Sequence, residues 1–148
     1  MLFRLTGRTR DAVLAEIAAA LARIAAPVDP QAVLRVLAER EDLSPTAVGE
    51  GIALPHGRIP GISGTRGVIA LADPGVPFGE PDGIPVRTFV GVVAPPQGSA
   101  GLLQALGLVS RRLQDAEVRR ALLAASTPAE VHALLVGSAP TWPAPAGP

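Results

Sequence analysis

Residues 39–59 have the sequence EREDLSPTAVGEGIALPHGRI, in which a charged run is followed by a short apolar run and then by proline, histidine, glycine and arginine. The segment from Val48 to Leu54 has the composition of a strand or extended chain. Pro55 has no backbone N–H and favours an extended conformation in the residue before it. We therefore predict that His56 lies at a strand end or a turn, and not inside a helix.

Two helical patterns lead into this stretch. Between Thr9 and Ala26, apolar residues recur at the three- and four-residue spacing of an amphipathic helix, with Thr9 or Asp11 as its cap. After Pro30, the run QAVLRVLAERED predicts a second helix that ends in consecutive charges, with Arg40 at its exposed end.

Strands and further helices follow the stretch. Short apolar runs at Gly67–Ala72 and Val86–Val93 are bounded by turn residues, which predicts two buried strands with a loop or hairpin between them. Three helical runs come next, at Ser99–Leu113, at LQDAEVRRALLAA up to Ala125, and from a Ser126 or Thr127 cap through Leu135. Helices that flank several short strands indicate an α/β domain, and the strand order stays open.

The length of 148 residues fits one domain. Residues 137–148, GSAPTWPAPAGP, are small, prolyl and uncharged, so we expect a disordered tail despite Trp142, with the domain in residues 1–136. The N-terminal sequence MLFRLTGRTRDAV is too charged for a signal peptide, and no run of about 18 apolar residues follows it. We therefore expect a cytoplasmic protein without direct membrane insertion.

Composition excludes several kinds of chemistry. Thirteen basic and thirteen acidic residues give a formal net charge of zero, which argues against nucleic acid as a partner. Every basic residue is arginine, so a Schiff-base lysine and a P-loop lysine are both excluded. Without cysteine there is no thiol nucleophile and no thiolate metal site. We predict no metal and no cofactor, which leaves histidine, arginine, hydroxyl groups and carboxylates for chemistry.

The opening stretch resembles the signature of the type-2 IIA domains of the bacterial phosphoenolpyruvate-dependent phosphotransferase system (PTS), the fructose, mannitol and nitrogen-regulatory class. The matching positions, in family order and spacing, are Arg40-Glu41, Thr46, Gly49, Gly51, Ile52, Ala53 and Pro55-His56-Gly57-Arg58. Similarity continues in GIPVRTFVGVVAPP, SRRLQD and STPAEVHALL, so that it spans about residues 9 to 136. The expected fold is a single α/β domain with a mixed parallel and antiparallel sheet of about five strands flanked by helices.

The resemblance implies that His56 is a phosphoacceptor. In that family the histidine of the Pro-His motif takes a phosphoryl group from a small histidine phosphocarrier protein, and sugar-transporting members pass it to a cysteine of a IIB domain. A neutral imidazole also offers a lone pair for in-line attack without a separate base. Phosphoryl transfer needs donors around the phosphoryl oxygens, and Arg40 and Arg58 are the candidates, with Thr46 adding a hydroxyl group.

Each candidate residue also has a structural interpretation. A histidine after a proline, such as His56, is often a turn residue. Arg40 also suits the negative end of its helix dipole, and Arg58 is also consistent with a solvated surface charge. Thr46 fits a turn or a cap equally well, and His132 has the spacing of a short amphipathic helix, which indicates a structural or surface role.

One position departs from the family pattern. Family members carry a second histidine at the start of the helix after the Ala-Pro strand, near the phosphorylated one. Counting back from Ser110, that position falls on Leu102, or on Gly101 after a one-residue shift, and neither side chain can hydrogen-bond a phosphoryl oxygen. His132 lies in a different predicted helix. Losing one positioned donor slows transfer by about 10²- to 10³-fold, which a regulatory switch tolerates better than a sugar flux.

The leading hypothesis is thus a regulatory IIA-like protein, similar to the nitrogen-regulatory branch, that a phosphocarrier protein phosphorylates on His56. It is an enzyme only in the sense of a phosphohistidine carrier, and its targets would be a kinase, a channel or a transporter. Three alternatives stay open. One is a sugar-specific IIA component that feeds a IIB domain, and another is a non-catalytic interaction module that binds partners through the surface around His56. The third is an unrelated protein that binds a phosphate-containing ligand through the same arginines.

Overall fold

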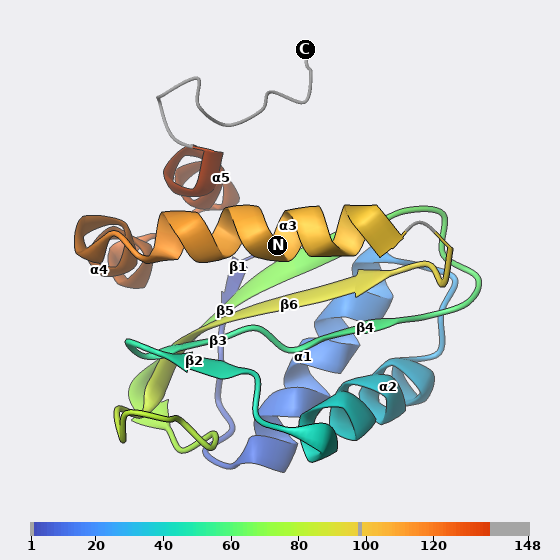
Figure 1. Cartoon of the computed structure of the whole chain (residues 1–148), viewed down its shortest axis with the longest axis horizontal. Coiled ribbons are helices and arrows are strands. Elements are labelled where there is room, and N and C mark those ends of the chain that lie inside the picture. The colour runs from blue at the N-terminus through green and yellow to red at the C-terminus, as the bar shows by residue number, and fades with distance from the viewer. Residues whose placement is uncertain (1, 98, 137–148) are drawn as a thin grey trace.

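The structure, a computed structural model, describes residues 2–97 and 99–136. One sheet lies between two layers of helices: helices from the N-terminal half cover one face, and helices from the C-terminal half cover the other (Figure 1). This arrangement confirms the predicted α/β class. The expected tail, residues 137–148, lies outside the described residues.

The sheet is mixed, as the sequence resemblance implied. Its strands are β1 (Leu2–Arg4), β2 (Ala47–Gly49), β3 (Ile52–Ala53), β4 (His56–Arg58), β5 (Arg66–Val76) and β6 (Val86–Ala94). Five of the six strands follow the order β1-β5-β6-β3-β2, and the sixth, β4, pairs with β6. The pairs β5–β6 and β2–β3 are antiparallel, whereas β1–β5, β3–β6 and β4–β6 are parallel. The two long central strands, β5 and β6, therefore pair antiparallel with each other. The short strand β1 pairs in parallel with β5, and the short strands β3 and β4 pair in parallel with β6.

The first face of the sheet is covered by α1 (Arg10–Ile24) and α2 (Pro30–Leu43). The Thr9 hydroxyl caps α1 by accepting the Ala12 N–H at 3.2 Å, as predicted, and the Asp29 carboxylate accepts a backbone N–H in the first turn of α2. The apolar stripe of α1 is fully buried against the sheet through Val13, Leu14, Ile17 and Leu21. This spacing of apolar residues explains why the segment forms a helix on this face.

The second face is covered by α3 (Ser99–Leu113), α4 (Ala116–Ala124) and α5 (Pro128–Val136). The guanidinium of Arg112 donates from Nε and Nη2 to the Leu134 carbonyl, at 3.1 and 2.7 Å. Because these bonds join the end of α3 to the last turn of α5, they fix how the two helices lie on the sheet.

The predicted cap before α5 is a carboxylate-centred network. The Glu130 carboxylate accepts the Ser126 N–H, the Ser126 hydroxyl and the Thr127 hydroxyl, at 3.2, 3.1 and 3.1 Å. The Thr127 hydroxyl in turn accepts the Glu130 N–H at 3.2 Å, which completes a capping box. These bonds hold the pKa of Glu130 below its ordinary value, and the bond from the Ser126 backbone N–H has the largest effect.

The lowered pKa of Glu130 predicts a pH-dependent contribution to stability. A carboxyl group whose pKa is lower in the folded state stabilises the fold above its unfolded-state pKa, and this contribution disappears as pH falls through the folded-state pKa. We expect Glu130→Ala to lower the thermal unfolding midpoint at pH 7, and to lower it by less at a pH well below the ordinary glutamate pKa of about 4.3. Unfolding scans of both chains at the two pH values measure this, and an equal difference at both would contradict it.

The expectation of one strand from Val48 to Leu54 is wrong, because the chain turns within it. Gly49, Glu50 and Gly51 have φ values of 94°, 58° and 75°, so three successive residues adopt the left-handed conformation. Glycine adopts it without steric cost. The result is a tight hairpin in which β2 and β3 pair antiparallel.

Candidate functional site

His56 begins β4, directly after the Leu54-Pro55 step that separates β4 from β3. Both short strands pair in parallel with the same long strand, β6. Pro55 has no N–H for this ladder, but its carbonyl accepts the Val92 N–H at 3.0 Å, so pairing continues across the break. His56 is thus held in extended backbone next to the centre of the sheet, in agreement with its predicted place at a strand end.

His56 and Arg58 project from the same face of the sheet. In the β4–β6 register His56 is paired with Val92 and Arg58 with Ala94, and directly paired residues point to one face. Val92 and Ala94 belong to the apolar cluster beneath α3, α4 and α5. Gly57, between the two, faces α2 on the opposite side. The strand pleat therefore brings the imidazole and one guanidinium together at the edge of the α3 layer.

The imidazole of His56 has a defined orientation. Its Nδ1 lies 2.7 Å from the Leu54 carbonyl oxygen, and the side chain is half-buried. A carbonyl oxygen only accepts hydrogen bonds, so Nδ1 carries the proton in this arrangement. In the neutral ring the lone pair then belongs to Nε2, which is the atom available to a phosphoryl group.

The two candidate arginines have different surroundings. Arg58 is half-buried and donates from Nη1 to the Pro95 carbonyl at 3.2 Å, at the end of β6 that leads to α3. Arg40 donates from Nη1 to the Ser44 carbonyl at 2.9 Å, at the C-terminal end of its own helix α2. Arg58 therefore shares the face of His56, whereas the observed contact of Arg40 is the helix-end contact that its sequence position also predicted.

Thr46 is buried, and its hydroxyl group is already engaged. The hydroxyl donates to Glu41 Oε1, and the Thr46 N–H donates to Glu41 Oε2, both at 2.7 Å. Thr46 thus joins the end of α2 to the start of β2, in keeping with the turn or cap role that was its alternative interpretation. Sequence reasoning matched Glu41 to the family signature but assigned it no role, and the only signal for one was its place beside Arg40 in the charged run.

Gly57 lies close against Val36 of α2. A Cβ atom built on Gly57 would overlap the Cγ1 atom of Val36. We therefore expect Gly57→Ala to lower the free energy of unfolding by about 1–3 kcal/mol, the usual cost of overpacking a core. Chemical unfolding measures the change.

Val36→Ala in the Gly57→Ala background is the matched control. It removes the methyl group that the new Cβ would meet, so we expect it to restore part of the lost stability. A double variant no more stable than Gly57→Ala would show that the cost arises elsewhere.

The model of the family "Phosphoenolpyruvate-dependent sugar phosphotransferase system, EIIA 2" matches residues 2–137. The chain belongs to this family. The match covers every helix and strand of the described structure, so the IIA resemblance inferred from residues 39–59 extends over the whole fold.

Individual relatives place this IIA chain more finely. It is 33% identical over 127 residues to the nitrogen regulatory protein of Bradyrhizobium diazoefficiens, a match that covers 86% of this chain and 82% of the relative. The crystal structure of the nitrogen regulatory protein IIA-Ntr from Neisseria meningitidis superposes with a TM-score of 0.84 at 26% identity, covering 90% of this chain and 91% of that one. The chain is thus similar to nitrogen-regulatory IIA proteins in sequence and in fold.

A sugar-specific IIA structure is also similar. The enzyme IIA of the Escherichia coli mannitol system, solved in complex with phosphorylated enzyme IIB, superposes with a TM-score of 0.72 at 26% identity and covers 90% of this chain and 94% of that one. The fold is therefore shared between regulatory and sugar-specific members of the family.

Leu102, the position to which the family resemblance assigns the second histidine, belongs to α3, and its side chain lies in the apolar core between that helix and the sheet. Its side chain is 5% exposed and belongs to the cluster that contains Leu54, Val92 and Ala94. Leu54 and Val92 are the residues that bond to His56 or pair with it. In this IIA chain, the aliphatic side chain of Leu102 thus packs into the layer that supports the candidate site and supplies no hydrogen-bond donor to it.

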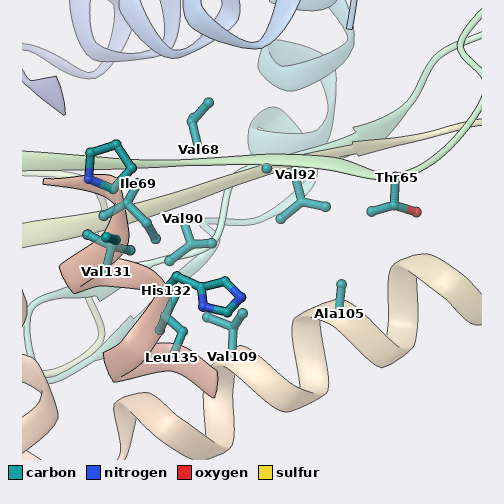
Figure 2. Close-up of a pocket in the computed structure, with 13 residues that line it drawn as sticks. Thr65, Val68, Ile69, Val90, Val92, Ala105, Val109, Val131, His132 and Leu135 are labelled. Carbon is teal, nitrogen blue, oxygen red and sulfur yellow. The ribbon is translucent and has the colours of Figure 1, made fainter. Parts of the chain in front are cut away.

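The other histidine, His132, lies at a separate apolar cavity. The cavity has a volume of about 540 Å³ and lies between the sheet, α3 and α5. Figure 2 shows the His132 ring close to Val109, below Val90 on the sheet. His132 belongs to α5, whereas Leu102 belongs to α3, and His56 is not among the residues that line this cavity.

No group of three or more histidine, cysteine or carboxylate side chains is placed to hold a metal ion in residues 2–97 and 99–136. Within the same ranges, no helix combines the length and apolar character needed to cross a membrane.

Proposed function

We propose that this IIA chain accepts a phosphoryl group on Nε2 of His56 from a histidine phosphocarrier protein and acts in regulation. The observation that carries the proposal is the imidazole geometry: Nδ1 bonds to the Leu54 carbonyl, and Nε2 is left as the nucleophile. The similarity to nitrogen regulatory proteins supports the regulatory role.

The transfer step follows from this geometry. The lone pair of His56 Nε2 attacks the phosphorus atom, the N–P bond of the carrier's phosphohistidine breaks, and the carrier imidazole leaves with the bonding electron pair. His56 Nδ1 keeps its proton, and the positive charge that develops on the ring strengthens its bond to the Leu54 carbonyl. Arg58, on the same face of the sheet as His56, is the candidate cation for the phosphoryl oxygens.

The test of phosphotransfer uses purified components. Incubation of the chain with phosphoenolpyruvate, enzyme I and a cognate phosphocarrier protein should yield an acid-labile, base-stable adduct, as expected of phosphohistidine. Failure to form it would overturn the proposal. For the regulatory role, binding to a target kinase, channel or transporter should differ between phosphorylated and unphosphorylated chains, and identical binding would overturn that part.

A second candidate is a sugar-specific IIA component that passes its phosphoryl group to a IIB domain. The mannitol IIA neighbour, solved in complex with phosphorylated IIB, supports it because the two chains share a fold. The replacement of the second histidine by Leu102 weighs against a high transfer flux. Rapid transfer of label from the phosphorylated chain to a IIB domain of the same organism would favour this candidate over regulation.

A further inference from the structure

Glu41 is a buried carboxylate that the proposed transfer does not use directly. Its side chain is 5% exposed, and none of the arginines in the described part of the chain forms an ion pair with it. Burying a charge is costly unless hydrogen bonds compensate for it. Here both carboxylate oxygens accept 2.7 Å hydrogen bonds from one residue, Thr46. Among the residues that the structure describes, Thr46 alone therefore supplies the hydrogen bonds that offset the cost of burying the Glu41 carboxylate.

From Thr46 a short series of hydrogen bonds leads to the imidazole. The Thr46 carbonyl accepts the Leu54 N–H at 3.1 Å, across the β2–β3 hairpin. The Leu54 carbonyl then faces His56 Nδ1 at 2.7 Å. Leu54 is thus held through its N–H and in turn holds the histidine through its carbonyl.

We propose that Glu41 and Thr46 form a positioning pair that fixes the tautomer of His56, by holding Leu54 where its carbonyl accepts the Nδ1 proton. The pair touches neither the phosphoryl donor nor the reacting nitrogen, so both members are positioning residues. The inference rests on the proposed function for its catalytic consequence, but its structural part is independent of that function.

Thr46 affects His56 by restricting the position of Leu54. The Leu54 N–H that bonds to Thr46 and the Leu54 carbonyl that bonds to His56 belong to different peptide units. The first bond therefore supports the second only by limiting the movement of Leu54. An unconstrained histidine side chain favours the tautomer with the proton on Nε2, which has no lone pair for attack at that atom. If Leu54 moves, the competent tautomer becomes less populated and the transfer rate falls in proportion.

The tautomer can be read directly by nitrogen-15 NMR of the imidazole at a pH where the ring is neutral. The chain has only two histidines, so in His132→Gln the two imidazole nitrogen signals both come from His56. In this background we expect mainly the Nδ1–H tautomer. Thr46→Val, which keeps the shape but removes the hydroxyl bond to Glu41, should raise the Nε2–H fraction, and Thr46→Ser should restore the original ratio.

The phosphorylation rate provides the second measurement. We expect Thr46→Val to slow transfer to His56 by about tenfold, the lower end of the effect of removing an outer supporting bond, and Thr46→Ser to recover most of the rate. Glu41→Gln, which keeps the side-chain shape but replaces one acceptor by a donor, should act in the same direction, and it takes the place of Thr46→Val if that variant does not fold.

The outcomes separate this inference from the proposed function. Folded Thr46→Val or Glu41→Gln chains with an unchanged tautomer ratio would overturn the positioning role, even if His56 is phosphorylated. A shifted ratio in a chain that is never phosphorylated would support the positioning role and overturn the proposed function instead.

Discussion

His56→Ala is expected to abolish the acid-labile phosphoryl adduct completely. The substitution removes Nε2, the nitrogen that the Nδ1 bond to Leu54 leaves as the nucleophile. No lysine or cysteine is present in the chain to accept the group instead. The measurement is label incorporation from phosphoenolpyruvate through enzyme I and the phosphocarrier protein, followed by acid and base treatment.

His132→Ala is the matched control, because His132 is the only other histidine in the sequence. It lies at the apolar cavity beside α5, so we expect label incorporation close to that of the unaltered chain. If label persists in His56→Ala and disappears in His132→Ala, the phosphoacceptor is His132, and the assignment to His56 is overturned.

Arg58→Ala is expected to slow transfer to His56 by about 10²-fold, the usual cost of losing one positioned donor at a developing charge. Arg58 lies on the same sheet face as His56, two residues along β4, with Gly57 between them. Arg58→Lys should recover only part of the rate, because an ammonium group cannot bind two phosphoryl oxygens with the planar geometry of a guanidinium. Single-turnover labelling gives the rate constants.

Arg40→Ala separates the two interpretations of the other arginine. If its guanidinium serves only the Ser44 carbonyl at the end of α2, the variant loses stability and keeps its transfer rate. A rate loss equal to that of Arg58→Ala would instead show that Arg40 leaves this contact to bind the phosphoryl group. A transfer rate unchanged in Arg58→Ala would contradict the role given to Arg58.

Sequence patterns predicted the helices better than the strands, for physical reasons. The apolar stripe and threonine cap of α1 and the cap network before α5 are local features, encoded within a few neighbouring residues. The strand β1 has three residues, Leu2–Arg4, and its existence depends on pairing with β5 far along the chain. Such pairing leaves no periodic pattern that a short window can detect.

The hairpin at Gly49–Gly51 was missed for a related reason. Gly49, Glu50 and Gly51 lie within a stretch from Ala47 to Leu54 whose other residues are all apolar, so the whole stretch resembles one strand, whereas the backbone is left-handed at these three positions. The two glycines that flank Glu50 were the available signal of a turn, because glycine is the residue best suited to that conformation.

Some features of the candidate site could likewise be predicted from local sequence, and others depend on tertiary packing. His56 and Arg58 follow from the motif and from the two-residue period of a strand, which places them on one face once β4 is known to be a strand. The engagement of Thr46 by Glu41 depends on how α2 meets the hairpin, a contact set by tertiary packing. The sequence alone therefore could not decide whether Thr46 is a site residue or a turn or cap residue.

The glycine between His56 and Arg58 also has a consequence for how the strand can assemble. A slip of one residue along β6 would turn His56 toward α2 and Gly57 toward α3. The space opposite α2 at that position has no room even for a methyl group, because Val36 already fills it. Gly57 therefore disfavours a one-residue slip of β4, because that slip would place a larger side chain against Val36, and so favours pairing that leaves the imidazole on the α3 side of the sheet.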